Sequence, residues 1–298
     1  MNVVAAIAVD GTIYAAWLFV MSVGLSLIYG VMRILNIAHG SLYALGAYAG
    51  ASLVIAYVNH GYPPYLSYLV LFGAALLVGL IAGPLIERGV LRWAYGRDEI
   101  VLLLVTYSVF LILEDVTKLI WGVNAYNASQ PYALLGRVSV AGLVYSVYDF
   151  MVVGFAVLVG AILWWVFNRT HAGRLILAVI HDQEVSLAMG INVPRMYLAA
   201  FTGGAALAAL GGALTAPMIS VVPGISVEVI VLAFAVVVVG GLGSLEGAAL
   251  GALIVGLARS ASVHLLPQIE LFVIYGVMAL VLVLRPQGLF GRAEVRRI

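Results

Sequence analysis

The sequence contains no cysteine and few charged residues. Of its 298 residues, 9% are charged and 64% are hydrophobic, whereas an average soluble domain carries about 25% charged residues. Without cysteine there are no disulfides and no thiol chemistry, and the five scattered histidines lack a zinc-type spacing, so we expect no metal site. A soluble fold of this length could not hide so much apolar surface. The composition therefore predicts an all-α, polytopic membrane protein, with residues 1–298 forming a single transmembrane domain.

The lengths of the apolar runs predict nine membrane spans. The run from Gly11 to Tyr57 would be about 70 Å long as one helix, against a hydrocarbon core of about 30 Å, so it must turn back at Arg33–Gly40. Residues 228–264 are too long for one crossing and short for two, and Gly240–Ser244 breaks them into two shortened or discontinuous spans. We expect the other spans at about 11–32, 40–58, 65–86, 100–120, 147–167, 196–219 and 269–284, with a loop at 87–99.

Basic residues are distributed unevenly between the two sides of these spans. If the polar loop at 168–197 is cytoplasmic, eleven of the fourteen Lys and Arg residues lie on the same side: Arg33, Arg88, Arg92, Arg97, Arg169, Arg174, Arg195, Arg285, Arg292, Arg296 and Arg297. This bias predicts an external N-terminus, at Asn2, and a cytoplasmic C-terminus.

The segment Asn168–Tyr197 is the longest run that cannot lie in a bilayer. Asp182 is a good helix N-cap, Gln183–Met189 is typical of a short helix, and Gly190 supplies the left-handed residue that ends it. Glu184 lies in the first turn, where the helix dipole favours a negative charge. A helix about 10 Å long is marginal alone in water, so we expect a soluble partner to hold it, with an ordinary connecting loop as the alternative.

Three segments carry a family resemblance. YGVMRILNIAHGSLYALGAY (Tyr29–Tyr48), GRLILAVIHDQEVSLAMGINVPRM (Gly173–Met196) and VVVVGGLGSLEGAALGALIVG (Val236–Gly256) resemble permeases of branched-chain amino acid ABC importers, more the H-type subunit than the M-type. The resemblance covers nearly the whole chain. It implies a type II-like importer permease fold and a non-catalytic translocation subunit for branched-chain or other hydrophobic amino acids. Urea, short-chain amides and small carboxylic acids are alternative substrates within the broad family.

The resemblance also implies partners. These are a second related permease or a second copy, two cytoplasmic ATPases that bind ATP and Mg, and an extracytoplasmic substrate-binding protein, all at a bacterial or archaeal cytoplasmic membrane. It implies contact with membrane lipid, no nucleic acid, no catalytic residue and no cofactor bound by this chain. The expected ATPase-docking residues are His181, Asp182, Gln183, Glu184, Leu187, Ala188, Met189, Gly190 and Ile191. Leu177 and Ser186 depart from the family pattern, which often has a basic residue and Ala there.

The candidate substrate pathway is formed by the two segments that interrupt the helices, Arg33–Gly40 and Gly240–Ser244, which we call the first and second break. Its expected residues are Asn36, His39, Gly40, Gly240, Gly241, Gly243 and Ser244. Irregular backbone at membrane depth is tolerated only against protein or a water-filled cavity, so we expect the first break to face the space between two permease subunits. Asn36 and His39 would then meet a zwitterionic substrate; the alternative is that they only cap helix ends.

Other functional classes predict features that the sequence largely lacks. An ion-coupled secondary transporter needs carboxylates deep in its spans, and these spans are nearly uncharged in their deep portions. An intramembrane enzyme needs a nucleophile with a nearby base, and no histidine follows Ser244 at a convincing distance. Glu114 and Asp115, near the outer end of a span, are expected to pair with Lys118, with a contact to the binding protein as the alternative.

Overall fold

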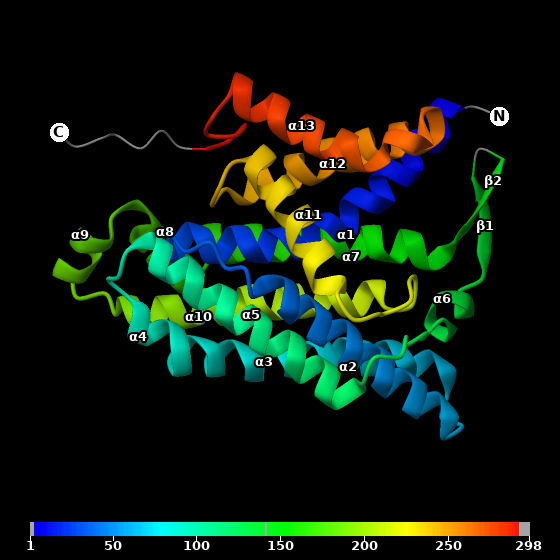
Figure 1. The fold of residues 1–298 in the computed structure, drawn as a ribbon, viewed down its shortest axis with the longest axis horizontal. Helices are drawn as coiled ribbons and strands as arrows, with labels where there is room; N and C mark the ends of the chain where they lie inside the picture. Colours follow the sequence, from blue (N-terminus) through cyan, green and yellow to red (C-terminus); the bar gives the residue numbers. More distant parts are fainter. Residues whose placement is uncertain (1–2, 141, 292–298) are drawn as a thin grey trace.

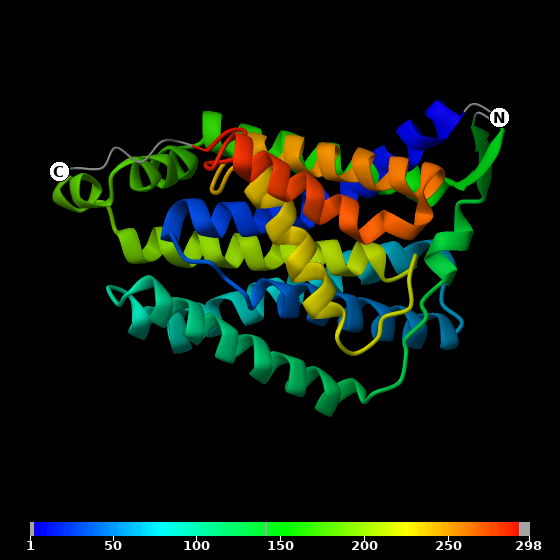
Figure 2. The same ribbon diagram turned by 45° about the horizontal axis from the view of Figure 1, so that its top comes forward.

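The computed structural model describes residues 3–140 and 142–291, which form a bundle of long helices (Figures 1 and 2). Seven helices are long and apolar enough to cross a membrane: α1 (Val3–Met32), α2 (His39–Asn59), α3 (Ser67–Ile86), α5 (Glu99–Trp121), α7 (Val147–Arg169), α10 (Val193–Thr215) and α12 (Leu245–Leu265). Two further helices in the described residues are apolar but shorter, α11 (Ile225–Gly240) and α13 (Glu270–Leu284). The predicted polytopic helical fold is thereby confirmed.

The two ends of the bundle carry different small elements. At one end, the "hairpin end", lie α6 (Gln130–Leu134) and an antiparallel pair of strands, β1 (Arg137–Val140) and β2 (Leu143–Ser146), which the all-α prediction did not include. At the other end, the "α9 end", lie α8 (His171–His181) and α9 (Gln183–Ala188) (Figure 1). The described chain begins at the hairpin end and finishes at the α9 end, as an odd number of crossings requires.

Helix α10 packs against both α1 and α2, and most residues of α2 and α10 are buried. Their glycines allow this packing: a Cβ at Gly212 would overlap the Tyr43 carbonyl oxygen, and a Cβ at Gly24 would lie 2.7 Å from the Gly204 carbonyl oxygen. Lipid supplies no hydrophobic drive for association, so close backbone approach is the way such helices gain packing energy. The small residues of α10, Gly204 and Gly212 among them, permit this close approach.

Several predicted boundaries were wrong. α1 begins at Val3, eight residues before the expected start, and the sixth span runs from Val193 to Thr215. The expected loop at 87–99 is mostly helix, because α3 continues through a π-helical turn, η2 (Glu87–Leu91), into α4 (Arg92–Ala94). Charged residues suggested a loop here, but the helix buries one side while its arginines remain exposed. Short 3-10 turns, η1 (Pro64–Leu66) and η3 (Pro267–Ile269), precede α3 and α13.

Candidate coupling loop and translocation pathway

The segment after α7 makes a tight corner into α8, a helix that the sequence reading missed. The Thr170 hydroxyl accepts a hydrogen bond from the Gly173 N–H at 3.0 Å and caps α8. A side chain at position 173 would overlap the Val166 carbonyl oxygen, so glycine is needed where α8 folds back on α7. Ile176 and Val179 are buried while the opposite side of α8 is exposed. This three-residue apolar spacing after a Thr cap was the signal available in the sequence.

Helix α9 has the predicted caps and ends one residue before the predicted boundary. The Asp182 carboxylate accepts from the Val185 N–H at 3.0 Å, and Gly190 adopts a φ of +82° that terminates the turn. Ser186, which departs from the family pattern, is buried and donates its hydroxyl to the Asp182 carbonyl oxygen at 2.7 Å. The difference between Ser186 and the alanine of the family pattern therefore lies on the buried side of α9 and does not alter its exposed side.

The outer side of α9 is apolar and exposed. Val185, Leu187 and Met189 are 53%, 51% and 75% exposed, and Ala188 beside them is also exposed. Exposed apolar groups gathered on a short helix are typical of a protein-binding surface. We call Val185, Leu187, Ala188 and Met189 the α9 surface. Of the other expected docking residues, Asp182 and Ile191 are half-buried, and those exposed around the α9 surface are His181, Gln183, Glu184 and Gly190.

The break between α1 and α2 re-enters the bundle. The Thr106 hydroxyl on α5 donates to the Leu35 carbonyl oxygen at 3.0 Å, which fixes the break against α5. Nε2 of His39, the first residue of α2, lies 2.8 Å from the Met21 carbonyl oxygen. Met21 lies eleven residues before the end of α1, or about 16 Å along the helix axis. α2 therefore starts near the middle of the bundle rather than at its α9 end.

Asn36 and His39 are completely buried within the chain. Among the described residues, the side-chain amide of Asn36 has no hydrogen-bond partner at either its oxygen or its nitrogen, and Nδ1 of His39 has none. The expectation that the break faces the space between two subunits does not hold for these two side chains, because their own chain encloses them. An unpaired buried amide costs about 1–3 kcal/mol. The break therefore holds an unsatisfied polar side chain near the middle of the bundle.

The glycine turn between α11 and α12 lies at the α9 end, away from the start of α2. Gly243 has a φ of +78°, and a Cβ there would lie 2.9 Å from the Gly30 Cα near the end of α1. The Ser26 hydroxyl donates to the Ser244 carbonyl oxygen at 2.9 Å, and Ser244 in turn caps α12. Gly40 instead contacts the first turn of α11. The two predicted parts of the pathway are therefore connected through α11 and do not form one cluster.

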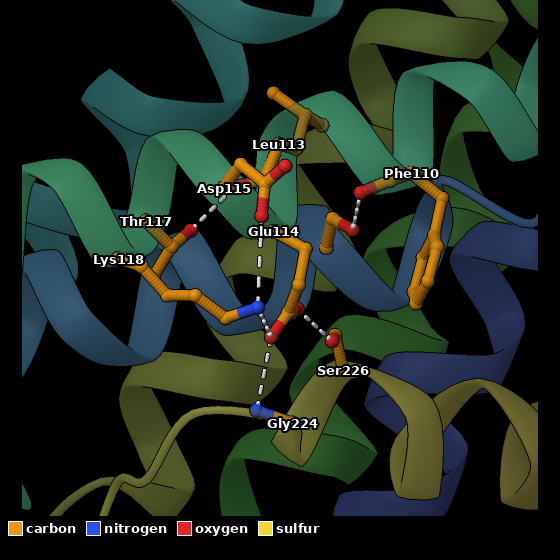
Figure 3. A network of polar contacts seen from close by, with 9 residues as sticks. Phe110, Leu113, Glu114, Asp115, Thr117, Lys118, Gly224 and Ser226 are labelled. Carbon is orange, nitrogen blue, oxygen red and sulfur yellow. Dashed lines mark hydrogen bonds and ion pairs between the residues drawn. The ribbon is translucent and has the colours of Figure 1, made fainter. Parts of the chain in front are cut away.

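Glu114 joins α5 to the start of α11, a role that the sequence reading did not identify (Figure 3). Its carboxylate accepts from the Gly224 N–H at 3.0 Å and from the Ser226 hydroxyl. Gly224 is the N-cap of α11 and has no side chain to serve as a cap, so Glu114 supplies it from another helix. The expected ion pairs are also present, with Lys118 Nζ 3.9 Å from Glu114 and 3.6 Å from Asp115.

A regularly spaced stripe of exposed residues, half of them polar or charged, runs along one side of α5. Its six members recur at alternating intervals of three and four residues, which places them on one helix face: Val101, Leu104, Ser108, Leu111, Asp115 and Lys118. All six are exposed, and Asp115 is 77% exposed although it lies about 9 Å from the Trp121 end of an otherwise apolar helix. A charge at that depth does not face lipid hydrocarbon without a large penalty. We call these six residues the α5 seam.

Comparison with known proteins assigns the chain to a family. Residues 7–282 match the family described as branched-chain amino acid transport system, permease component. The chain belongs to this family. The predicted family resemblance is thereby confirmed, and the protein is a multi-pass permease subunit of an ABC importer.

Individual relatives match over nearly the full length of the chain. The high-affinity branched-chain amino acid transport system permease protein BraD of Pseudomonas aeruginosa is 30% identical, covering 97% of this chain and 96% of its own. The corresponding protein LivH of Escherichia coli is 26% identical, covering 97% and 94%. The fructose import permease protein FrcC of Rhizobium meliloti is 31% identical, covering 84% of this chain and 66% of its own. The chain is thus similar to permeases whose names specify different substrates.

Proposed function

We propose that this chain is one of two permease subunits in an ATP-driven importer of branched-chain and other hydrophobic amino acids. The observation that carries the proposal is the α9 surface, which exposes Leu187 and Met189 on a capped helix beyond the ends of α7 and α10. Such a surface suits the groove of a soluble ATPase, because burying exposed apolar side chains drives association. ATP and Mg are bound by those partners, and this chain provides translocation without catalysis.

The α9 end is proposed to face the cytoplasm. Eight described arginines, all exposed, lie at this end: Arg33, Arg88, Arg92, Arg97, Arg169, Arg174, Arg195 and Arg285. Lys118, Arg137 and Arg259 belong to the elements of the opposite half. This asymmetry supports an inward-facing α9 end and an external hairpin end, where a substrate-binding protein would dock. Whole-cell labelling with an impermeant thiol reagent should modify V4C and leave E184C unmodified; the reverse pattern refutes the orientation.

The second permease subunit is proposed to pack on the α5 seam. The regular spacing of the seam suits packing against another helix, and its Asp115 and Lys118 require protein or water as neighbours. Subunits of a permease pair share one membrane orientation, so two identical copies of α5 would bring Asp115 to face Asp115. Like charges at that depth are unfavourable, which supports a related but non-identical partner.

The route through the membrane is proposed to open at the break between α1 and α2. Asn36, His39 and Gly40 would become accessible when the break moves away from Thr106 on α5, and the glycine turn would form the inner end of the path. α9 is joined to α10 by residues 189–192, and α10 packs directly on α1 and α2. Movement of α9 on its ATPase therefore has a continuous packed connection to the break.

The substrate class is supported by the names of BraD and LivH, and FrcC shows that a similar degree of identity also occurs with a fructose importer. Purified permease pair, ATPases and binding protein in proteoliposomes provide the test. We expect uptake of radiolabelled leucine that requires internal ATP and the external binding protein. Uptake driven by an ion gradient without ATP would refute the importer, and uptake of another solute with leucine excluded would refute the substrate.

A further inference from the structure

Three arginines converge on one cavity at the α9 end of the bundle. The π-helical turn after α3 carries Arg88, α4 carries Arg92, and the first turn of α10 carries Arg195. They line a cavity of about 290 Å³ together with Glu87, Asn192, Pro194 and Leu198. Without the helical continuation of α3, Arg88 and Arg92 would not be held opposite α10.

The described residues do not balance the charge of this cavity. None of the three arginines forms an ion pair with a described residue. Among the described residues of the lining, the one carboxylate belongs to Glu87, which is buried and accepts a hydrogen bond from the Tyr95 hydroxyl at 2.7 Å. Guanidinium groups gathered without acidic partners favour an anion from outside, and a phosphate matches their fork of donors.

A second cavity continues from the first into the membrane region. It has a volume of about 560 Å³ and shares Arg88, Arg195 and Leu198 with the first cavity. The remainder of its lining is mainly apolar and comes from α3 and α10: Leu80, Pro84, Ala199, Thr202, Gly203 and Ala206. From Arg195 to Ala206 the groove follows α10 for about 16 Å, roughly half of a 30 Å hydrocarbon core. This depth suits an acyl chain of one leaflet.

We propose that the two cavities together bind one anionic phospholipid of the leaflet at the α9 end. The phosphate lies among Arg88, Arg92 and Arg195, and one acyl chain lies in the groove between α3 and α10. A soluble phosphate would use the arginines and leave the groove empty, and an acidic protein surface could not enter a groove at membrane depth. Basic pockets between helices at the cytoplasmic boundary are a known setting for anionic lipid headgroups.

The test measures lipid bound to the purified permease without its ATPases, using native mass spectrometry after exchange into phosphatidylglycerol or phosphatidylcholine. We expect the protein to retain phosphatidylglycerol. The triple variant R88Q/R92Q/R195Q should lose at least about tenfold in retention, because each arginine near the surface strengthens the attraction. The matched triple R97Q/R169Q/R174Q, which changes exposed arginines outside the cavity at the same end, should retain the lipid. Monodisperse elution and unchanged helicity establish that each variant is folded.

A variant of the groove separates a lipid from a free anion. Ala199→Trp fills the groove from its exposed side and leaves the arginines intact, so it should reduce phosphatidylglycerol retention by several fold. Equal retention by the wild type and R88Q/R92Q/R195Q would overturn the proposal. So would displacement of the lipid by millimolar inorganic phosphate, or an A199W variant that retains the lipid fully. Loss of ATPase binding in R88Q/R92Q/R195Q with lipid retention unchanged would assign the arginines to a protein contact instead.

Discussion

The Glu114 carboxylate accepts a hydrogen bond from the Gly224 N–H at 3.0 Å and thereby caps a helix 110 residues away in the sequence. Removing it in Glu114→Ala leaves the first turn of α11 without a cap and should destabilise the protein by about 1 kcal/mol. Thermal unfolding in detergent should show a fall in Tm of about 2–4 °C. Glu114→Gln keeps a hydrogen-bond acceptor, so its Tm should fall by less than that of Glu114→Ala.

Asp115→Asn is the matched control in the chain purified without its partner subunit, where Asp115 is exposed and pairs with Lys118. Its Tm should be within error of the wild type, because exposed ion pairs contribute little. An unchanged Tm in Glu114→Ala would mean that the Lys118 contact, and not the α11 cap, is the main role of Glu114.

The role of Glu114 could not be predicted from the sequence, because it depends on a contact between distant segments. Signals contained within a few residues were sufficient for the Asp182 cap, the Gly190 stop and the glycine turn before Ser244. The partner of Glu114 lies on another helix, and Pro223-Gly224 gives no indication of which side chain replaces its missing cap. A pattern within one helix cannot supply that information.

Burial of Asn36 and His39 was unpredictable for a related reason. In a membrane protein both lipid and core are apolar, so hydrophobic periodicity does not show which side of a helix faces protein. The arginines within residues 87–99 likewise suggested a loop. Long arginine side chains can, however, reach the membrane interface from a helix that continues. Which elements pack together, and at what depth, had to come from the structure.

The buried amide of Asn36 gives opposite expectations for stability and transport. Asn36→Leu removes two unpaired polar atoms and keeps the number and branching of side-chain heavy atoms, so it should raise the free energy of unfolding by about 1 kcal/mol. If Asn36 meets substrate when the break opens, the same variant should lower ATP-driven uptake while subunit assembly and basal ATP hydrolysis stay near normal. Uptake in proteoliposomes and thermal unfolding measure the two effects.

His39→Ala should likewise lower uptake without loss of assembly. Normal uptake in both variants would remove the break from the pathway. Loss of assembly in both variants would show that these residues only support the fold.

The α5 seam predicts the position of the second subunit. A photoreactive benzoylphenylalanine at Leu111, near the middle of the seam, should cross-link to a related permease of different mass in membranes that contain the assembled transporter. The same probe at Ile162, an exposed apolar residue of α7, should give no protein adduct. An adduct at twice the mass of this chain would mean a homodimer, and no adduct at position 111 would place the interface elsewhere.

Docking of an ATPase on α9 can be measured as the affinity of the purified ATPases for the solubilised permease pair. Ala188→Arg places an unpaired charge in the α9 surface and should weaken binding by at least about tenfold. Asn168→Arg adds the same charge at an exposed position on α7 and should leave the affinity unchanged. Equal affinities for the wild type and Ala188→Arg would mean that α9 is not the docking helix.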